Sequence, residues 1–406
     1  MDRFRESLLV IAFVATVLFI CEVYIFRNIE LCICDTTEIV TVEPSWSSSL
    51  DKRNENGTHT TEKLYFKIST ELLEKNIPED VDDSIIWDAS VDKVAYLHAK
   101  FDNFCYKPEE PYFEHKQPLE RSKLDRRGCQ KRLPQIIIPG ARKCGTGALM
   151  KFLNTHPNIT GASEELHFFD EWRVQKNVSD YREDMPYTTS HQFTLDKTPS
   201  YFFRPHNTPQ LIKDEISLDT KIIIVLCDPV RRAVSDYLEF LWLEEQRYKK
   251  GIVAKKKEMR SFEHLVWDHA SIRGGVNQLN EMVDMGVYIK HLIRWYDVFS
   301  EEQILLLDGS FLLTDPVSEL KKVEKFLGLR NFFLKEHFSL NEERGIFCMD
   351  FPSKYCLPGC KGRKHPHVED KVWATLCDFF APYDRSLEQM TGKHFSWVGK
   401  CSSQDQ

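Results

Sequence analysis

The first residues whose types and spacing could do chemistry lie between an apolar run and a helix. Residues 136–138 are three isoleucines, which predicts a buried strand, and Pro139 and Gly140 are expected to end it. A short loop of small residues follows, and a helix is expected to begin at Thr146. Backbone N–H groups in such a loop and the positive end of the helix dipole converge on one anion. This stretch therefore predicts a phosphate-binding site.

The same loop carries two cations. Arg142 and Lys143 add positive charge beside the expected anion. Gly140 and Gly145 have the separation of the two glycines in a nucleotide P-loop, but the lysine that directly follows the second glycine in a P-loop NTPase is absent. The pattern favours an anionic donor held without Mg-triphosphate machinery, which argues against a nucleotide kinase. A glycine-containing strand-to-helix turn without a ligand is the alternative.

A carboxylate and an imidazole follow the first helix. Glu165 and His167 are two residues apart, and in an extended segment their side chains point to the same side. Beside an anion-binding loop, Glu165 could act as a general base and take a proton from an acceptor hydroxyl. A surface glutamate next to a structural histidine is the alternative.

Two more polar groups follow apolar segments. Lys197 comes after one of them and could bind a substrate or stabilise transferred charge. Ser235 is expected on the first turn of the helix after strand 221–226, with Arg231 and Arg232 before it, which suits a second phosphate. Two anion sites, each after a strand, are what a bis-phosphorylated nucleotide requires.

Strands and helices must alternate to position these residues. The expected elements are strands at 136–138, 221–226 and 304–307, a strand ending near Phe168 and Phe169, and helices at about 282–299 and 316–327. This alternation predicts an α/β fold with a central, mostly parallel sheet and helices on both faces. Ligands bind such sheets at the carboxyl ends of the strands, where the Gly140 loop and the turn at Asp228 are expected.

The N-terminal part has the features of a membrane anchor. Residues 8–26 are almost all apolar, and as a helix they would span roughly 28 Å, close to the thickness of a bilayer core. Arg3 and Arg5 precede them, which by the positive-inside tendency places the N-terminus in the cytosol and the rest in the lumen. A cleaved signal peptide is the alternative.

The expected organisation follows from that anchor. It comprises a cytosolic tail (1–7), a transmembrane signal anchor (8–26), a lumenal stem (27–132) and a catalytic domain (133–401). Within the stem, residues 35–60 lack hydrophobic periodicity, which predicts disorder, and residues 85–104 suggest an amphipathic helix that packs on the catalytic domain.

Composition sets further bounds. The chain has 406 residues, a net charge of −8 and 42% hydrophobic residues, which is ordinary globular composition and gives no indication of nucleic-acid binding. Basic runs at 247–260 and 361–367 are either solvated surface or sites for an anionic polymer. The 12 cysteines have no metal-like spacing, so no metal site is expected, although Cys348 and Cys356 bracket a short loop as a disulfide would. Sequons at Asn56, Asn158 and Asn177 indicate a glycoprotein of the secretory pathway.

Taken together, these segments resemble the lumenal glycosaminoglycan sulfotransferases, and most closely the heparan sulfate glucosamine 3-O-sulfotransferases. The matching segments are Arg-Lys-Cys-Gly-Thr-Gly at 142–147, Glu-Leu-His-Phe-Phe-Asp at 165–170, Asp-Lys-Thr-Pro-Ser-Tyr-Phe at 196–202, Asp-Pro at 228–229 with Ser-Asp-Tyr at 235–237, and Lys-Gly-Arg-Lys-His-Pro at 361–366. The resemblance runs from about Leu133 to Trp397. It implies a P-loop-like sulfotransferase fold and transfer of a sulfuryl group from 3'-phosphoadenosine 5'-phosphosulfate (PAPS) to the 3-hydroxyl of glucosamine in heparan sulfate, without a metal. It also implies a single-pass type II protein of the Golgi membrane.

The resemblance assigns the matching residues to three groups. Those expected to hold the donor are Arg142, Lys143, Cys144, Gly145, Thr146 and Gly147 at the 5'-phosphosulfate, Cys227 and Ser235 at the 3'-phosphate, and Lys361, Gly362, Arg363, Lys364 and His365 in a turn that closes over the nucleotide. Those expected in catalysis are Glu165 as base, Lys143 and Lys197 as charge stabilisers, and His167. Those expected to line the glycan cleft are His167, Asp170, Lys197, Thr198 and Pro199. The family's disulfide corresponds to Cys348 and Cys356.

Three positions depart from the family pattern. Cys144 replaces a glycine, and Gly147 and Cys227 each replace an arginine, so two positive charges are missing. One lost charge-assisted hydrogen bond costs about 1.5–3 kcal/mol. Arg231 or Arg232 could compensate, and the N-sulfotransferase domains also lack an arginine at the position of Cys227, so activity is expected to be kept. The alternatives are N-sulfation or another glycosaminoglycan O-sulfation, and a glycan-binding relative with weakened catalysis. The pairing of the other cysteines stays open.

Overall fold

A computed structural model describes residues 104–400 except 108, 110, 112–113, 171–176, 256–258, 270–274 and 358–364. The predicted anchor at 8–26, nearly all of the predicted helix at 85–104 and the sequon at Asn56 lie outside the described residues, as do Lys361 to Lys364 of the basic turn. Among the helices that are described, none combines the length and apolar character needed to cross a membrane.

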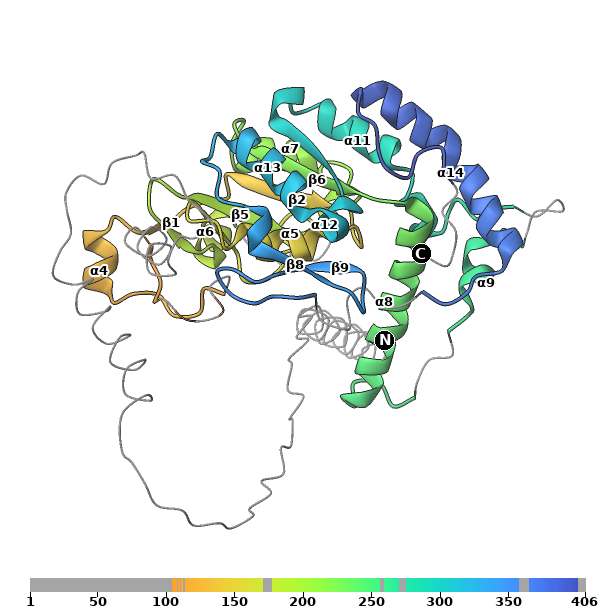
Figure 1. Cartoon of the computed structure of the whole chain (residues 1–406), viewed down its shortest axis with the longest axis horizontal. Helices are drawn as coiled ribbons and strands as arrows, with labels where there is room; N and C mark the ends of the chain where they lie inside the picture. The colour runs from red at the N-terminus through yellow and green to blue at the C-terminus, as the bar shows by residue number, and fades with distance from the viewer. Residues whose placement is uncertain are drawn as a thin grey trace, which may run out of the picture.

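A five-stranded sheet forms the centre of the molecule (Figure 1). Its strands are β2 (Ile136–Gly140), β3 (Ile159–Gly161), β5 (Phe193–Lys197), β6 (Lys221–Leu226) and β7 (Ile304–Asp308). They lie in the order β3-β5-β2-β6-β7, and each neighbouring pair is parallel. The predicted α/β class with a parallel sheet is confirmed, and the central strands read as continuous apolar runs because both faces of such a sheet are covered.

The covering helices follow from the strand order. Those nearest the sheet are α5 (Thr146–Leu153), α7 (Thr208–Glu215), α11 (Tyr288–Tyr296) and α13 (Pro316–Leu327), and two long helices, α8 (Pro229–Lys249) and α14 (Asp370–Thr391), pack against each other. Figure 1 shows α5 on one side of the sheet and α7 and α11 on the other. The chain runs from β2 towards β3 in one direction along the sheet, and from β5 to β6 to β7 in the opposite direction. Because crossovers between parallel strands are right-handed, the helices that connect these two sets of strands lie on opposite faces of the sheet.

Shorter elements complete the fold. They are α4 (Arg121–Arg126), β1 (Gln130–Lys131), α6 (Val178–Asp184), β4 (Tyr187–Thr188), η1 (Pro199–Phe202), α9 (Phe262–Val266), α10 (Glu281–Asp284), η2 (Glu301–Gln303), α12 (Phe311–Thr314), η3 (Lys335–His337), β8 (Phe338–Asn341) and β9 (Ile346–Met349). Strands β1 and β4 form one antiparallel pair, and β8 and β9 form another.

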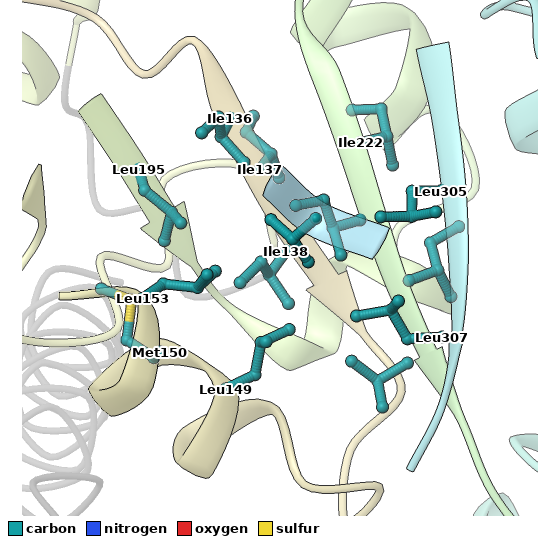
Figure 2. Packing of buried hydrophobic residues seen from close by; sticks show 14 of the residues in the cluster. Ile136, Ile137, Ile138, Leu149, Met150, Leu153, Leu195, Ile222, Leu305 and Leu307 are labelled. Atoms are coloured by element: carbon teal, nitrogen blue, oxygen red, sulfur yellow. The ribbon is translucent and has the colours of Figure 1, made fainter. Parts of the chain in front are cut away.

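The core lies between α5 and the sheet. Figure 2 shows Leu149, Met150 and Leu153 of α5 beside Ile138 of β2 and Leu195 of β5. All but Met150 are completely buried, and Met150 is 6% exposed. Each buried side chain of this size contributes about 1.5–3 kcal/mol through removal of apolar surface from water. The strand and the helix on either side of the predicted anion loop are therefore rigidly held.

Two predicted elements were wrong in detail. The helix expected at 282–299 is interrupted between α10 and α11, where Gly286 lets α14 approach: a Cβ at Gly286 would lie 2.7 Å from the ring of Phe380. Phe168 and Phe169 do not end a strand. They are buried in the loop after β3, and Phe168 stacks on Tyr181 with ring centroids 4.3 Å apart. Their apolar character reflects this aromatic packing.

Packing begins before Leu133. Phe104, Cys105 and Tyr106 are buried in the main core, and a disulfide joins Cys105 to Cys129 with a Cα–Cα distance of 5.9 Å. The last part of the predicted stem is thus attached to the domain that the sequence places at 133–401.

Candidate functional site

The loop after β2, which the sequence predicts to bind an anion, leads directly into α5. Gly145 has φ 95°, a left-handed conformation that favours glycine, and serves as the N-cap of α5. The N–H of Ala141 donates to the carbonyl of Val225 at 2.7 Å, which ties the loop to β6. Behind the loop, a Cβ at Gly309 would lie 2.4 Å from the carbonyl oxygen of Cys144. The loop therefore lies against the carboxyl ends of both β6 and β7.

The two unexpected cysteines of the donor site form a disulfide. The Cα atoms of Cys144 and Cys227 are 5.3 Å apart, and the bond joins the loop to the residue that follows β6. The hydroxyl of Tyr288 donates to the carbonyl of Cys227 at 2.7 Å and lies 3.5 Å from Sγ of Cys144. From the sequence these two cysteines were expected to be separate departures from the family pattern, and their pairing was left open. Their occurrence together, at two departures from one family pattern, was the signal that could have predicted the bond.

Arg142 is anchored to helix α8. Its Nε lies 2.9 Å from Oδ1 of Asp236 and its terminal nitrogen donates to Oδ2 at 3.0 Å, while Arg232 donates to Oδ2 at 3.1 Å. Burial alone would raise the pKa of Asp236, but the charges of Arg142 and Arg232 hold it below its usual value. Asp236 thus stays ionised between two guanidinium groups. The guanidinium of Arg142, predicted to contact the donor, already fixes the loop to α8.

Lys143 is paired across the same cleft. Its Nζ lies 3.0 Å from Oε2 of Glu239 on α8, and its backbone has φ 74°. Burial lowers the pKa of His365, and the charges of Arg231 and Lys143 lower it further. These electrostatic interactions link His365 to the loop and to α8. Because Lys361 to Lys364 lie outside the described residues, closure of the basic turn over the nucleotide stays a prediction.

The start of α8 differs from its predicted form. Ser235 lies on the second turn, because α8 begins at Pro229. The carboxylate of Asp228 caps the helix and accepts the N–H groups of Val230 at 2.9 Å and Arg231 at 3.1 Å. These N–H groups are already satisfied. A phosphate here would depend on side chains such as Ser235 rather than on the end of the helix.

A second polar cluster lies at the end of β5. Lys197 forms an ion pair with Glu165, and Asp170 accepts hydrogen bonds from Nδ1 of His167 and, at 2.6 Å, from Oγ of Ser200. Nε2 of His167 lies 3.7 Å from Oε2 of Glu165. The side chains of Glu165, Lys197 and His167 are 29%, 12% and 14% exposed, so the cluster is accessible but largely sheltered.

This cluster adjoins the loop. Lys197 pairs in register with Ile138 of β2, and a Cβ at Gly140 would lie 2.5 Å from Cβ of Phe202, which follows in η1. The structure therefore brings the Glu165 segment and the anion loop to adjacent strand ends. The predicted geometry was wrong in one respect: His167 has φ 49°, so the segment is not extended, and a loop rather than strand alternation brings the two side chains together.

Two predicted cleft residues lie inside the protein. Thr198 is completely buried and donates from Oγ1 to Asp196 at 3.1 Å, and Pro199 is buried at the start of η1. Burial raises the pKa of Asp196 to about 6, although Tyr181 donates to its carboxylate at 2.7 Å. These buried residues support the end of β5 from inside the protein and do not line an open cleft.

The sequence did not predict a cavity of about 260 Å³ that lies beside the loop after β2. Its lining is Phe203, Arg204, His206, Gln278, Leu279, Glu281, Asp284 and Lys290. It adjoins the donor loop, because the guanidinium of Arg142 lies 5.8 Å from the ring centroid of Phe203. Its residues come from segments about eighty positions apart, so no local pattern could have identified it.

The remaining predicted sites have mixed outcomes. Cys348 and Cys356 are joined by a disulfide, as expected. Asn177 is exposed at the N-cap of α6, whereas the side-chain amide of Asn158 donates to the carbonyl of His191 at 3.1 Å. Within the described ranges, no group of three or more His, Cys, Asp or Glu side chains is arranged to hold a metal ion.

Comparison with known proteins matches this architecture. The model of the sulfotransferase domain family matches residues 133–356. Mouse heparan sulfate glucosamine 3-O-sulfotransferase 3A1 is 38% identical over 273 residues, which are 66% of this chain and 65% of that protein. Mouse heparan sulfate glucosamine 3-O-sulfotransferase 5 is 37% identical over 268 residues, 65% of this chain and 74% of that protein.

Solved structures give a weaker comparison. A sulfotransferase from Alicyclobacillus acidocaldarius is 22% identical, and the comparison covers 65% of this chain and 98% of that chain with a TM-score of 0.46. The assignment of this chain to a family therefore rests on the family model and on the sequence relatives. The family model spans more than half of the chain, and 37% identity extends over about three quarters of one relative. The chain belongs to the sulfotransferase domain family and, within it, to the heparan sulfate glucosamine 3-O-sulfotransferases.

Proposed function

We propose that this protein transfers a sulfuryl group from PAPS to the 3-hydroxyl of glucosamine residues in heparan sulfate. The observation that carries the proposal is the Glu165–Lys197 ion pair at the end of β5, one strand away from the anion loop that follows β2. The relatives named above are 38% and 37% identical to this chain over the matched regions and are named for that reaction. The matched region covers 65% of the first relative, so the activity rests on both observations together.

The residues present suit the two anionic ends of the donor. At one end are the loop, Lys143 and the helix that begins at Thr146, and at the other are Ser235 and Arg231 with His365 close by. Bound PAPS would supply an electrophilic sulfur and a phosphate leaving group. Lys361 to Lys364, which the sequence places in the closing turn, would complete the nucleotide site.

In the proposed mechanism, Glu165 takes the proton from the glucosamine hydroxyl as its oxygen attacks sulfur. The bond between sulfur and the phosphate oxygen breaks, and the negative charge that develops on that oxygen is stabilised by Lys143 and the loop N–H groups. Lys197 holds the Glu165 carboxylate in place. Asp170 and Ser200 fix the ring of His167, which lines the acceptor side.

The cavity beside Arg142 suggests where the polymer continues. Arg204 and Lys290 are exposed cations on its rim, and they are partly neutralised by Glu281 at 3.4 Å and by Asp284. Exposed charges of this kind are screened by salt. We expect heparan sulfate binding to weaken steeply with ionic strength.

The cellular setting belongs to the same proposal. The apolar segment at 8–26 would anchor a single-pass type II protein in the Golgi membrane with residues 27–132 as stem and 133–401 in the lumen. Disulfides at Cys105–Cys129 and Cys348–Cys356 agree with an oxidising compartment. Asn56, Asn158 and Asn177 remain predicted glycosylation sites.

Substitution of the base tests the mechanism. Glu165→Gln keeps the shape of the side chain and removes its ability to accept a proton, so turnover should fall to a few per cent or less. Binding of 3'-phosphoadenosine 5'-phosphate (PAP), followed by calorimetry, should be unchanged. Disaccharide analysis of heparan sulfate labelled by the wild-type protein identifies the sulfated position. Full turnover by the variant, or label on the glucosamine nitrogen, would contradict the proposal.

A glycan-binding protein with weakened catalysis is the second candidate. It is favoured by the pairing of Lys143 with Glu239 and by the occupation of the α8 N-terminus by Asp228, both of which compete with a donor. Retention on heparin together with no heat of PAP binding would establish it.

A further inference from the structure

The Cys144–Cys227 disulfide joins the two segments to which the proposed function assigns the two ends of the donor. Cys144 lies in the loop at the 5' end, and Cys227 follows β6 immediately before the helix that carries Ser235. The two cysteines are 83 residues apart in sequence. The disulfide adds a covalent link between these segments to the hydrogen bond from Ala141 to Val225 and the ion pairs of Arg142 and Lys143 with α8.

The Cys144 end of the disulfide is buried, and Tyr288 packs against the bond. Cys144 is 3% exposed, and the buried hydroxyl of Tyr288 contacts both sulfur atoms, at 3.5 Å from Cys144 and 4.0 Å from Cys227. Behind the loop, the backbone of Gly309 leaves no space for a side chain. Cys227 is partly exposed, so solvent reaches the bond from that side.

Ion pairs also join the loop to α8, but they engage the cations that are expected to meet the donor. Cys227 is neutral, Lys143 is engaged by Glu239, and Arg142 is engaged by the buried Asp236. When Lys143 leaves Glu239 to meet the donor, that ion pair no longer joins the loop to α8, whereas the disulfide still joins the loop to the end of β6. A preformed site binds more tightly because less conformational freedom is lost on binding.

We propose that the Cys144–Cys227 disulfide is a positioning cross-link that holds the loop and the end of β6 at the separation the donor requires. Intact, it lets both ends of the nucleotide bind without reordering the loop. Reduced, it leaves two neutral thiols and a loop that must be ordered by the nucleotide itself. The inference rests on the proposed function and adds to it a dependence of donor binding on the redox state of this bond.

The chemistry of reduction is ordinary thiol–disulfide exchange. A thiolate of dithiothreitol attacks Sγ of the exposed partner Cys227, the bond to Cys144 breaks, and Cys144 leaves as a thiolate that takes up a proton. The second thiol of dithiothreitol then attacks the mixed disulfide, forms the cyclic oxidised reagent and releases Cys227 as a thiol. Two electrons and two protons pass to the protein.

Thermodynamic linkage couples nucleotide binding and the redox state of the disulfide in both directions. If the intact bond favours nucleotide binding, then bound nucleotide must favour the intact bond by the same factor. In equilibrium with dithiothreitol, PAP should therefore raise the fraction of Cys144–Cys227 that stays oxidised in the wild-type protein. Cys105–Cys129 lies in the segment before β2 and provides an internal reference that should not respond.

The experiment has two arms. In the first, calorimetry measures PAP binding to the oxidised wild type and to Cys144→Ser/Cys227→Ser, and steady-state kinetics are measured on both. We expect binding to weaken on the order of tenfold, with a larger change in KM for PAPS than in kcat. Dithiothreitol should weaken binding by the wild type and leave the double variant unchanged. In the second arm, alkylation and mass spectrometry measure the oxidised fraction of each disulfide in the wild type, in equilibrium with dithiothreitol, with and without PAP.

Each outcome decides the matter. A folded double variant, judged by near-ultraviolet circular dichroism, that binds PAP as tightly as the wild type overturns the cross-link role while the proposed function stands. PAP that binds without protecting Cys144–Cys227 relative to Cys105–Cys129 overturns it too, and this arm decides if the double variant does not fold. A wild type that fails to bind PAP in its oxidised form overturns the proposed function and this inference together, and retention of that protein on heparin would then establish the glycan-binding candidate.

Discussion

At the scale of single residues, the site is described best by which carboxylate holds which cation. Glu165 holds Lys197, Asp236 holds Arg142 and Arg232, and Glu239 holds Lys143. The Glu165–Lys197 pair holds the proposed base in place, and the pairs of Asp236 fix the loop to α8 through Arg142. The Glu239–Lys143 pair competes with the proposed binding of the donor, because the Lys143 amine must leave Glu239 to meet a phosphate.

Glu239→Gln should therefore tighten nucleotide binding. Lys143 and Glu239 are 17% and 18% exposed, and an ion pair of this kind is worth roughly 1 kcal/mol, which predicts about a fivefold lower Kd for PAP. Calorimetry at low salt measures it. Glu245→Gln, which breaks the exposed pair with Lys249 further along α8, is the matched control and should leave the Kd unchanged. Weaker binding by Glu239→Gln would show that Glu239 supports the site.

At the scale of elements, the position of the proposed donor loop, residues 141–145, depends on the ends of three strands that lie close together. The loop leaves β2, is bonded to Cys227 after β6, and lies against Gly309 after β7. Because Gly309 has no side chain, the Cys144 carbonyl can approach it closely, and the N–H of Gly309 donates to Leu226 at 2.7 Å. A change at the end of β7 should therefore act on a loop that is distant in sequence.

Gly309→Ala tests this coupling. The added Cβ would lie 2.4 Å from the Cys144 carbonyl oxygen, so the loop must shift, and we expect both a lower melting temperature and weaker PAP binding. The overpacking cost is about 1–3 kcal/mol. Ser310→Ala, next along the chain, adds no atom and should change neither value. Normal PAP binding by Gly309→Ala would mean that the loop yields without affecting the site.

The elements also show what sequence could and could not predict. Strands β2, β6 and β7 and helices α5 and α13 were predicted because their apolar runs and breaks are local. The proximity of Glu165 and His167 was predicted for the wrong reason, since a left-handed residue and not strand alternation creates it. The Asp228 cap, the Glu239 pair and the Cys144–Cys227 bond were missed, because each depends on which side chains the tertiary fold brings together.

At the scale of the whole molecule, buried acids near the donor site link stability to pH. Asp384 on α14 is 7% exposed, and burial raises its pKa from 3.8 to about 7, with the charges of Asp228 and Glu388 adding to the rise and Arg385 opposing it. Between these values the folded state keeps a proton that the unfolded state has released. The contribution of Asp384 to stability is therefore full below about pH 4 and is lost as the pH rises towards 7.

Asp384→Asn should remove that dependence. The amide does not ionise, so the variant should gain stability relative to the wild type as the pH rises, by an amount on the order of a few kcal/mol at pH 8. Urea unfolding at pH 5 and pH 8 measures the difference. Asp378→Asn, on the same helix and without a buried carboxyl, is the control and should follow the wild type. A constant difference at the two pH values would show that Asp384 does not titrate in this range.

The Cys105–Cys129 disulfide has a consequence for how the protein can be shed. The bond closes the segment that connects the predicted anchor to the sheet. A protease that cuts one peptide bond between these cysteines leaves both fragments attached through sulfur. Release of a soluble form by a single cleavage therefore requires a cut outside this loop, either on the N-terminal side of Cys105 or on the C-terminal side of Cys129, and only the first of these leaves the bonded segment on the released form.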